Sequence, residues 1–302
     1  GQAKQTVKTT VDHIRVGVER IKDTVANTKP DLVGKTKIGQ PFAVWKKTKG
    51  EVDYRFVAVR TAPKRMRYVL FGKKGALEKV LLTGIFVKVA PRVGGGRLHI
   101  NITGANELGD APWATGMIHV FFANHKADAR ARRIVYRKFK KSDEKAGIPW
   151  NFGVDLIRFP GKGGRLRSVG VGNILQNPDT VEAAAMRVLW KTGVGGRADG
   201  VLFHLWPVPA KFIGAVHECW DGAFLRVAYK DSVAGNEASE PDEGDPTDKT
   251  KCGDYPQEDV DQSAANPDKS DADPEIDAML EELEVDQIDE KAAGDQTDPE
   301  AG

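Results

Sequence analysis

Residues 97–103 read Arg-Leu-His-Ile-Asn-Ile-Thr and show the clearest two-residue alternation in the chain. In an extended strand, successive side chains point to opposite faces. The apolar and polar residues would therefore separate onto two faces, with Leu98, Ile100 and Ile102 on one and His99, Asn101 and Thr103 on the other. This segment predicts a β-strand with one solvated face.

Similar strand-like runs lie on both sides of this segment. They cover residues 52–59, 66–71, 80–90, 116–122, 133–139, 154–159, 166–171, 201–206, 212–220 and 223–229. Glycine-rich breaks at 94–96 and 161–164 are interpreted as turns that need positive φ. The spacing predicts a mainly β fold, arranged as an antiparallel β-sandwich or barrel.

Two helices are expected beside these strands. Residues 5–27 carry an apolar heptad seam of Val7, Val11, Ile14, Val18, Ile21 and Val25, which predicts an N-terminal amphipathic helix. That helix could pack on the body, self-associate or attach to a membrane surface. One internal helix is predicted over 180–191, capped by Asp179 and ended before Gly193, with an apolar face of Val181, Ala184, Ala185, Val188 and Leu189.

Charge divides the 302-residue chain into two blocks of opposite sign. Residues 231–302 hold 25 Asp and Glu against four Lys, a net charge of −21. Since the whole chain has a formal net charge of +2, residues 1–230 carry +23. A basic body of this size favours a polyanionic partner, because Lys and Arg release counterions from phosphates.

These patterns predict three parts: an N-terminal helical segment at 1–30, a basic β-rich domain at 31–230 and an acidic disordered tail at 231–302. Within the tail, Asp273-Pro274-Glu275 could begin a short helix at 274–285. Its apolar side would contain Ile276, Met279, Leu280 and Leu283. It could fold on a partner, or it could be a nascent helix with no role.

Few residues suggest catalysis or metal binding. The six histidines have no spacing typical of zinc sites, and neither glycine-rich break matches a phosphate-binding loop. His217-Glu218-Cys219 lies in a strand-like run, so it is interpreted as structural. We expect no enzymatic activity, no cofactor and no metal.

The two cysteines, Cys219 and Cys252, predict neither a disulfide framework nor a metal set, which favours a reducing intracellular setting. No apolar run is long enough for a transmembrane segment.

The strongest candidate site is a basic cluster interleaved with aromatic residues. It contains Lys126, Arg130, Arg132, Arg133, Tyr136, Arg137, Lys138, Lys140 and Lys141, and Phe139 lies among them. Lys and Arg bind phosphates with little base preference, and exposed aromatic rings stack on single-stranded bases. The cluster predicts a single-stranded nucleic-acid site, with RNA preferred over DNA; a solvated charged face is the alternative.

Residues 82–110, LTGIFVKVAPRVGGGRLHINITGANELGD, resemble the central region of the thirty-kilodalton superfamily of plant-virus movement proteins, especially its tombusvirus-like and ourmiavirus-like members. The shared order is a hydrophobic strand near a proline, a glycine-rich turn and a second alternating strand. The resemblance implies cooperative RNA binding and targeting to plasmodesmata. An Asp that many members carry at the end of the second strand has no direct counterpart, since Asp110 comes later.

The leading hypothesis is therefore a viral movement protein, located in the host cytoplasm and at cell junctions. It would carry RNA from cell to cell, and its acidic tail would bind a viral coat protein or host factor. Alternatives are a jelly-roll coat or nucleocapsid protein and a cellular RNA-binding protein. The tail could also occupy the basic surface and limit RNA binding.

Overall fold

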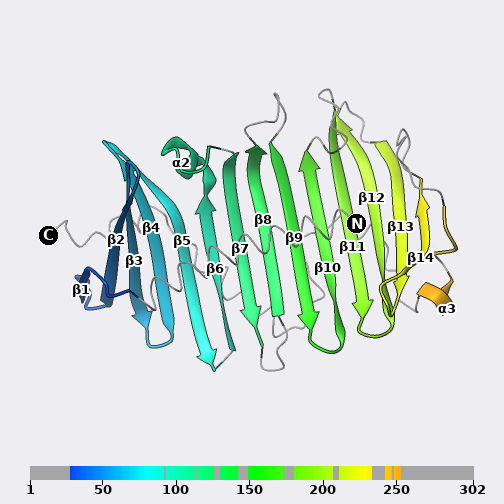
Figure 1. Cartoon of the computed structure of the whole chain (residues 1–302), viewed down its shortest axis with the longest axis horizontal. Coiled ribbons are helices and arrows are strands. Elements are labelled where there is room, and N and C mark those ends of the chain that lie inside the picture. The colour runs from blue at the N-terminus through cyan, green and yellow to red at the C-terminus, as the bar shows by residue number, and fades with distance from the viewer. Residues whose placement is uncertain are drawn as a thin grey trace.

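The computed structural model describes residues 28–91, 93–112, 114–125, 130–141, 149–172, 174, 180–206, 211–232, 242–246 and 248–252. Within these ranges, fourteen strands form one antiparallel sheet in which each strand pairs with its neighbours in the chain (Figure 1). The strands are β1 (Leu32–Lys35), β2 (Pro41–Lys49), β3 (Val52–Ala62), β4 (Arg65–Lys74), β5 (Leu77–Ala90), β6 (Val93–Asn101), β7 (Ala114–Asn124), β8 (Arg130–Lys141), β9 (Trp150–Phe159), β10 (Gly163–Gly172), β11 (Val181–Lys191), β12 (Gly195–Trp206), β13 (Lys211–Asp221) and β14 (Arg226–Asp231).

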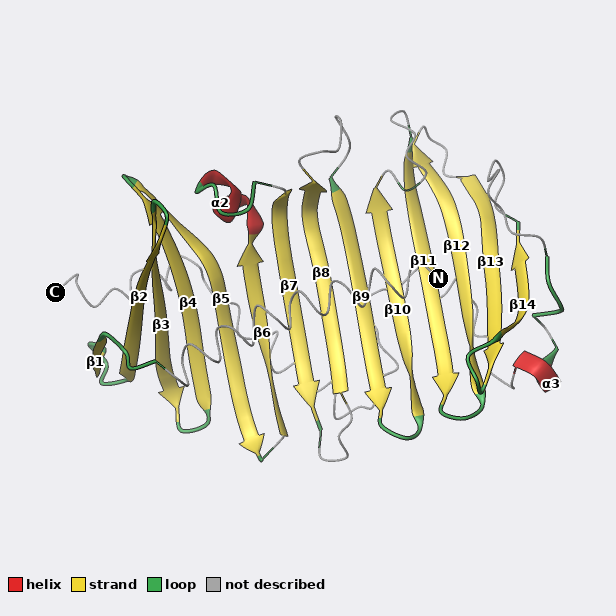
Figure 2. Cartoon of the chain, in the orientation of Figure 1, coloured by secondary structure: helices red, strands yellow, loops and turns green. Residues whose placement is uncertain are grey.

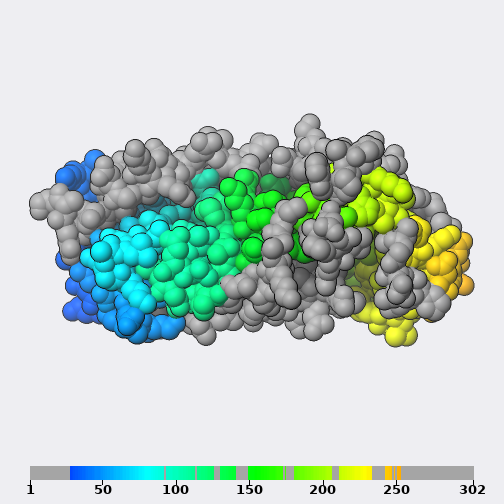
Figure 3. Space-filling view, turned by 90° about the horizontal axis from the view of Figure 1, so that it is seen from above, coloured from blue at the N-terminus to red at the C-terminus, as the bar shows by residue number. Residues whose placement is uncertain are grey.

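In the described part of the chain, two short helices accompany the sheet (Figure 2). Helix α2 (Ile102–Glu107) follows β6, and α3 (Lys249–Cys252) lies beside β12–β14. The described residues follow the long axis of the molecule in chain order (Figure 3). No helix among them is both long and apolar enough to cross a membrane.

The prediction of a mainly β, antiparallel fold is confirmed, but the sandwich or barrel is replaced by a single sheet. Among the described strands, β1 pairs only with β2, and β14 pairs only with β13. Every connection joins strands that are adjacent in both sequence and space. A sandwich would need connections between two sheets, and closure would need pairing between the edge strands.

The predicted internal helix at 180–191 is wrong, because this segment forms β11. It pairs along its whole length with β10 and β12. Both of its faces carry apolar side chains, so its pattern also fits the 3.6-residue period of a helix. Pairing on both edges outweighs the high helix propensity of its three consecutive alanines, Ala183, Ala184 and Ala185.

Two local expectations around β6 also need correction. Gly94, Gly95 and Gly96 lie inside β6 rather than in a turn. The strand ends at Asn101, whose side chain accepts a hydrogen bond from Gly104 N at 2.8 Å and caps α2. Capping satisfies one of the free N–H groups at the start of the helix and redirects Ile102 and Thr103 out of the strand.

The sheet has two faces with different compositions. Face A is the side of Leu98, Val120 and Ile134, which are paired directly across β6, β7 and β8. Face B is the side of Arg97, Phe121 and Arg133 on the same strands. Apolar clusters on face A extend from β2 to β8 and continue under α2. Face B is apolar over β2–β4, around Val44, Val57 and Val69, and again over β7–β9, around Ala123, Ala131 and Ile157.

The predicted N-terminal helix over residues 5–27 lies outside the described residues, as does the predicted tail helix at 274–285 with Ile276, Met279, Leu280 and Leu283. Two described pieces of the predicted tail, residues 242–246 and 248–252, contact the C-terminal strands. Glu243 forms a β-bridge with Tyr229, and Cys252 forms a disulfide with Cys219. The expectation of two unlinked cysteines is therefore wrong, because the chain returns to β13 after leaving the sheet.

Candidate nucleic-acid interface

The predicted basic cluster lies mainly on β8, but it does not form one surface. Successive side chains of a strand point to opposite faces, and β8 follows this rule from Arg130 to Tyr136. Arg130 and Arg132 lie on face A, whereas Arg133 lies on face B. The sequence-predicted cations are therefore divided between two sides of the sheet.

On face A, the cluster contributes to packing as well as to charge. Tyr136 and Phe139 pack against the apolar cluster around Ile118 and Ile134, with their rings 5.3 Å apart. Arg132 donates to the carbonyl oxygens of Ala123 and Ala131 and to Asn124 Oδ1. Burial, together with the charge of Arg130, lowers the pKa of Arg132 to about 10.

Other members of the cluster lie near the end of β8. Arg137 and Lys138 are exposed, and Lys138 adopts φ +50° at an irregularity in the pairing of β8 with β9. Lys140 is half-buried, and Lys141 is the last residue of β8. Lys126 lies outside the described residues.

A different set of cations is aligned on face B. Strand register places one residue of each strand in a continuous line across the sheet, which we call the arginine row. From β4 to β14 it contains Arg67, Ile85, Arg97, Phe121, Arg133, Asp155, Arg167, Arg187, Asp199, His217 and Lys230. Ten strand spacings give the row a length of about 50 Å.

The arginine row carries more positive than negative charge. It has five Arg and Lys230 against two carboxylates, Asp155 and Asp199. Asp155 Oδ1 accepts a hydrogen bond from Arg133 Nε at 2.7 Å. Arg65 and Arg165 lie in the next line of residues on face B and add to the positive charge.

Two arginines of the row, Arg97 on β6 and Arg187 on β11, are almost fully buried, whereas the row residues between them are half-buried. Arg97 is only 4% exposed and Arg187 only 7% exposed. At the β4 end, burial lowers the pKa of Arg67, and the charge of Arg65 lowers it further. Several arginines that share one face make its electrostatic potential positive, so this face is suited to anionic groups.

A histidine pair lies beside the row. His99 Nδ1 and His119 Nδ1 are 2.6 Å apart, so one ring donates a hydrogen bond and the other accepts it. Burial lowers the pKa of His99 to about 4, helped by the charges of His119, Arg97 and Arg137. Burial and Arg137 also lower the pKa of His119. Near neutral pH, the positive charge beside Arg97 therefore comes from arginine alone.

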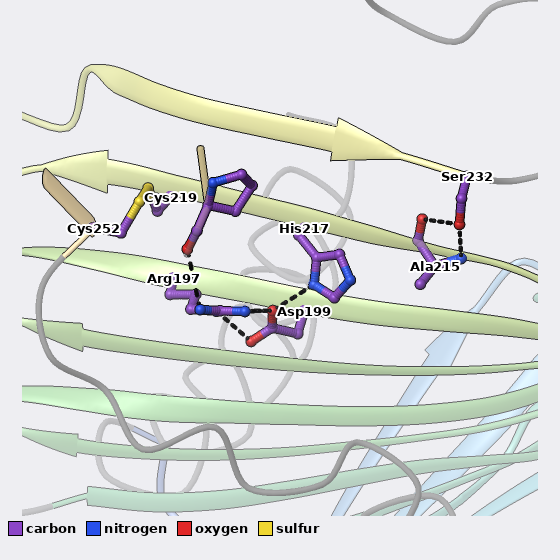
Figure 4. Close-up of polar contacts among 8 residues, drawn as sticks. Arg197, Asp199, Ala215, His217, Cys219, Ser232 and Cys252 are labelled. Carbon is purple, nitrogen blue, oxygen red and sulfur yellow. Dashed lines mark hydrogen bonds and ion pairs between the residues drawn. A yellow bond between two sulfur atoms is a disulfide. The ribbon is translucent and has the colours of Figure 1, made fainter. Parts of the chain in front are cut away.

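The β12–β13 end of the row is anchored by a charged cluster (Figure 4). Asp199 accepts hydrogen bonds from His217 Nδ1 at 2.7 Å and from Arg197 Nε at 2.8 Å. Burial would raise the pKa of Asp199, but these two partners outweigh it and hold the pKa below its usual value. Arg197 also donates to Pro246 O at 3.2 Å, which places the returning chain over face B.

Sequence reasoning missed Arg97, Arg187 and Phe121 as site residues. Phe121 lies between Arg97 and Arg133 in the arginine row, where a base could stack beside two guanidinium groups. These residues are far apart in the chain, and only the strand register aligns them. The sequence shows the alternating pattern around each of these residues, but it does not show which residue of the neighbouring strand each one pairs with.

The described residues contain no metal site, and the comparisons show no family relationship. Among the described residues, no group of three or more His, Cys, Asp or Glu could hold a metal ion. Comparison with protein-family models, curated proteins and solved structures gives no match for this chain.

Proposed function

We propose that this protein binds single-stranded RNA along face B, with the arginine row as the contact surface. The supporting observation is the alignment of five arginines in register across β4–β11. Arginine pairs well with phosphate, and a row of point charges contacts a flexible backbone without reading base edges. Phe121 would contribute sequence-tolerant stacking.

We further propose that the bound RNA is viral and that the protein transports it between plant cells. This part of the proposal rests on the resemblance of residues 82–110 to plant-virus movement proteins. The Cys219–Cys252 disulfide bears on location, because disulfides persist mainly in oxidising compartments. A fluorescent fusion in leaf cells tests this part. Puncta at cell junctions would support it, and retention in the secretory pathway would contradict it.

RNA binding is tested by comparing two faces of one hairpin. Arg165 and Arg167 lie on face B of β10, whereas exposed Arg158 lies on face A of β9. We expect the double variant Arg165→Gln/Arg167→Gln to weaken binding of a labelled 20-nucleotide RNA at least 10-fold at 50 mM salt. The control Arg158→Gln should change affinity less than 2-fold. Equal losses of affinity in both variants would refute the proposal.

A further inference from the structure

We infer that the acidic segment 253–302 binds along the arginine row and covers it in the free protein. Arg97 and Arg187 are only 4% and 7% exposed although they lie on the face of a single sheet. A guanidinium group on such a face needs a covering layer to become this buried. Among the described residues, 242–246 and 248–252 return over face B, and they contact the C-terminal end of the sheet.

The position at which the acidic segment 253–302 begins favours its binding along the arginine row. Cys219 is on face B of β13, in the line of residues next to the arginine row. The disulfide therefore holds Cys252 on the same face, beside the cluster of Arg197, Asp199 and His217. The chain that follows Cys252 begins at one end of the row.

The acidic segment 253–302 matches the arginine row in charge and is long enough to span it. Residues 253–302 contain 18 Asp and Glu against two Lys, a net charge of −16. The N-terminal 27 residues carry five Lys and Arg against three Asp and Glu, so they are not complementary to a cationic row. Nine strand spacings from β13 to β4 amount to about 43 Å, which a 50-residue extended chain of about 160 Å spans easily.

Carboxylates of the segment would then occupy the positions proposed for RNA phosphates. Attachment at Cys252 keeps them at high effective concentration, so RNA must displace them before it binds. This competition rests on the proposed function, whereas binding of the segment to the row does not.

Arginine-specific labelling tests the binding without RNA. Phenylglyoxal is added to the full oxidised protein, and labelled sites are identified by mass spectrometry. The variant replaces six acids by amides: Glu281→Gln, Glu282→Gln, Glu284→Gln, Asp286→Asn, Asp289→Asn and Glu290→Gln. We expect labelling of Arg97, Arg167 and Arg187 to rise at least 3-fold in the variant, and also in the parent protein at 1 M salt.

Exposed Arg130 and Arg158 on face A are the internal controls, and their labelling should stay constant. Unchanged labelling of the row in both the variant and high salt would overturn the inference. Labelling of the arginine row that depends on protein concentration would also overturn the inference, because a second copy of the protein would then cover the row.

RNA binding separates this inference from the proposed function. If both hold, the amide variant binds RNA at least 10-fold more tightly than the parent at 50 mM salt. Increased labelling without RNA binding in either protein would refute only the proposed function. RNA binding that is sensitive to Arg165→Gln/Arg167→Gln, with row labelling unchanged in the amide variant and in high salt, would refute only the inference.

Discussion

Gly96 lies where two aromatic rings meet across three strands. Gly96 pairs with Phe86 of β5 on one side and with Phe122 of β7 on the other. The rings of Phe86 and Phe122 stack on face A with their centroids 6.2 Å apart. A Cβ at this position would lie 2.4 Å from Ile85 O and 2.8 Å from the Phe122 ring. The absence of a side chain is therefore required by a close approach of backbone and ring.

Gly96→Ala should lower the free energy of unfolding by about 1–3 kcal/mol, because the methyl group forces backbone and ring apart. The matched control is Gly153→Ala in β9, where the nearest atoms to a new Cβ are 4.0 Å away. Urea unfolding followed by circular dichroism compares the two variants. Equal stability of both would contradict the packing described for β6.

His99 makes stability depend on pH. Its pKa is about 4 in the folded protein, below the ordinary value of 6.5. The unfolded chain therefore binds more protons between these values, so the stabilisation is full above pH 6.5 and is lost as pH falls toward 4. Allowing for partial burial, the loss is on the order of 2 kcal/mol.

The difference in unfolding free energy between pH 7 and pH 4.5 should be smaller in His99→Gln than in the parent protein. Denaturant titrations at several pH values measure it, and the comparison cancels most of the carboxylate contribution. An identical pH dependence in both proteins would show that His99 titrates normally in the fold.

At the scale of elements, the Cys219–Cys252 disulfide fastens α3 to β13 and closes a loop with a sequence separation of 33. Loop-closure entropy alone predicts a stabilisation of about 3–4 kcal/mol for this length. Cys252→Ser should lower the denaturant midpoint accordingly. The parent protein should lose the same amount when a dithiol is added, and the variant should not respond. If the denaturant midpoint of the parent protein did not change on addition of the dithiol, this prediction would be wrong.

Face A provides a test of the predicted N-terminal helix. Thr28 O accepts a hydrogen bond from Trp45 Nε1 at 2.9 Å, so the chain leaves the predicted helix beside the aromatic cluster of β2–β4. A helix over residues 5–27 would be about 35 Å long, close to seven strand spacings. Its apolar seam is therefore long enough to cover the apolar clusters of face A.

If that packing occurs, Ile14→Ser and Ile21→Ser should each destabilise the protein by about 1–3 kcal/mol, because each exposes a buried side chain. Lys8→Gln and Lys22→Gln, on the polar side of the same segment, should change stability by less than about 0.5 kcal/mol. Chemical denaturation measures all four. Equal effects of the two pairs would instead favour a helix detached from the sheet.

At the scale of the whole molecule, the proposed RNA site is distributed over many strands, so its energetics should be electrostatic. The logarithm of the RNA-binding constant should fall linearly with the logarithm of salt concentration. Removing Arg165 and Arg167 should reduce the slope by about 1.4, or about 0.7 per lost phosphate contact. Homopolymeric RNAs of different base should give similar slopes. A salt-independent affinity would contradict phosphate recognition by face B.

Much of the fold was predictable from local patterns. The alternation in residues 97–103 and in the other predicted runs reports which residues can share a strand face, and strands formed at nearly all of them. The failure at β11 has a local cause, since an alanine-rich segment that is apolar on both faces fits two periodicities. For the candidate site, proximity in sequence was misleading: Arg132 and Arg133 are neighbours in the chain and lie on opposite faces of the sheet.

The sequence by itself determined the β character of the body and the separation of basic from acidic charge, because both depend on residue identity and short-range order. Only the tertiary structure decided that the strands form one open sheet, that Cys252 bonds to Cys219 and that five arginines stand in one row. The reason is register. A shift of one residue in a strand moves its side chains to the other face, and the contacts that set the register join residues of different strands.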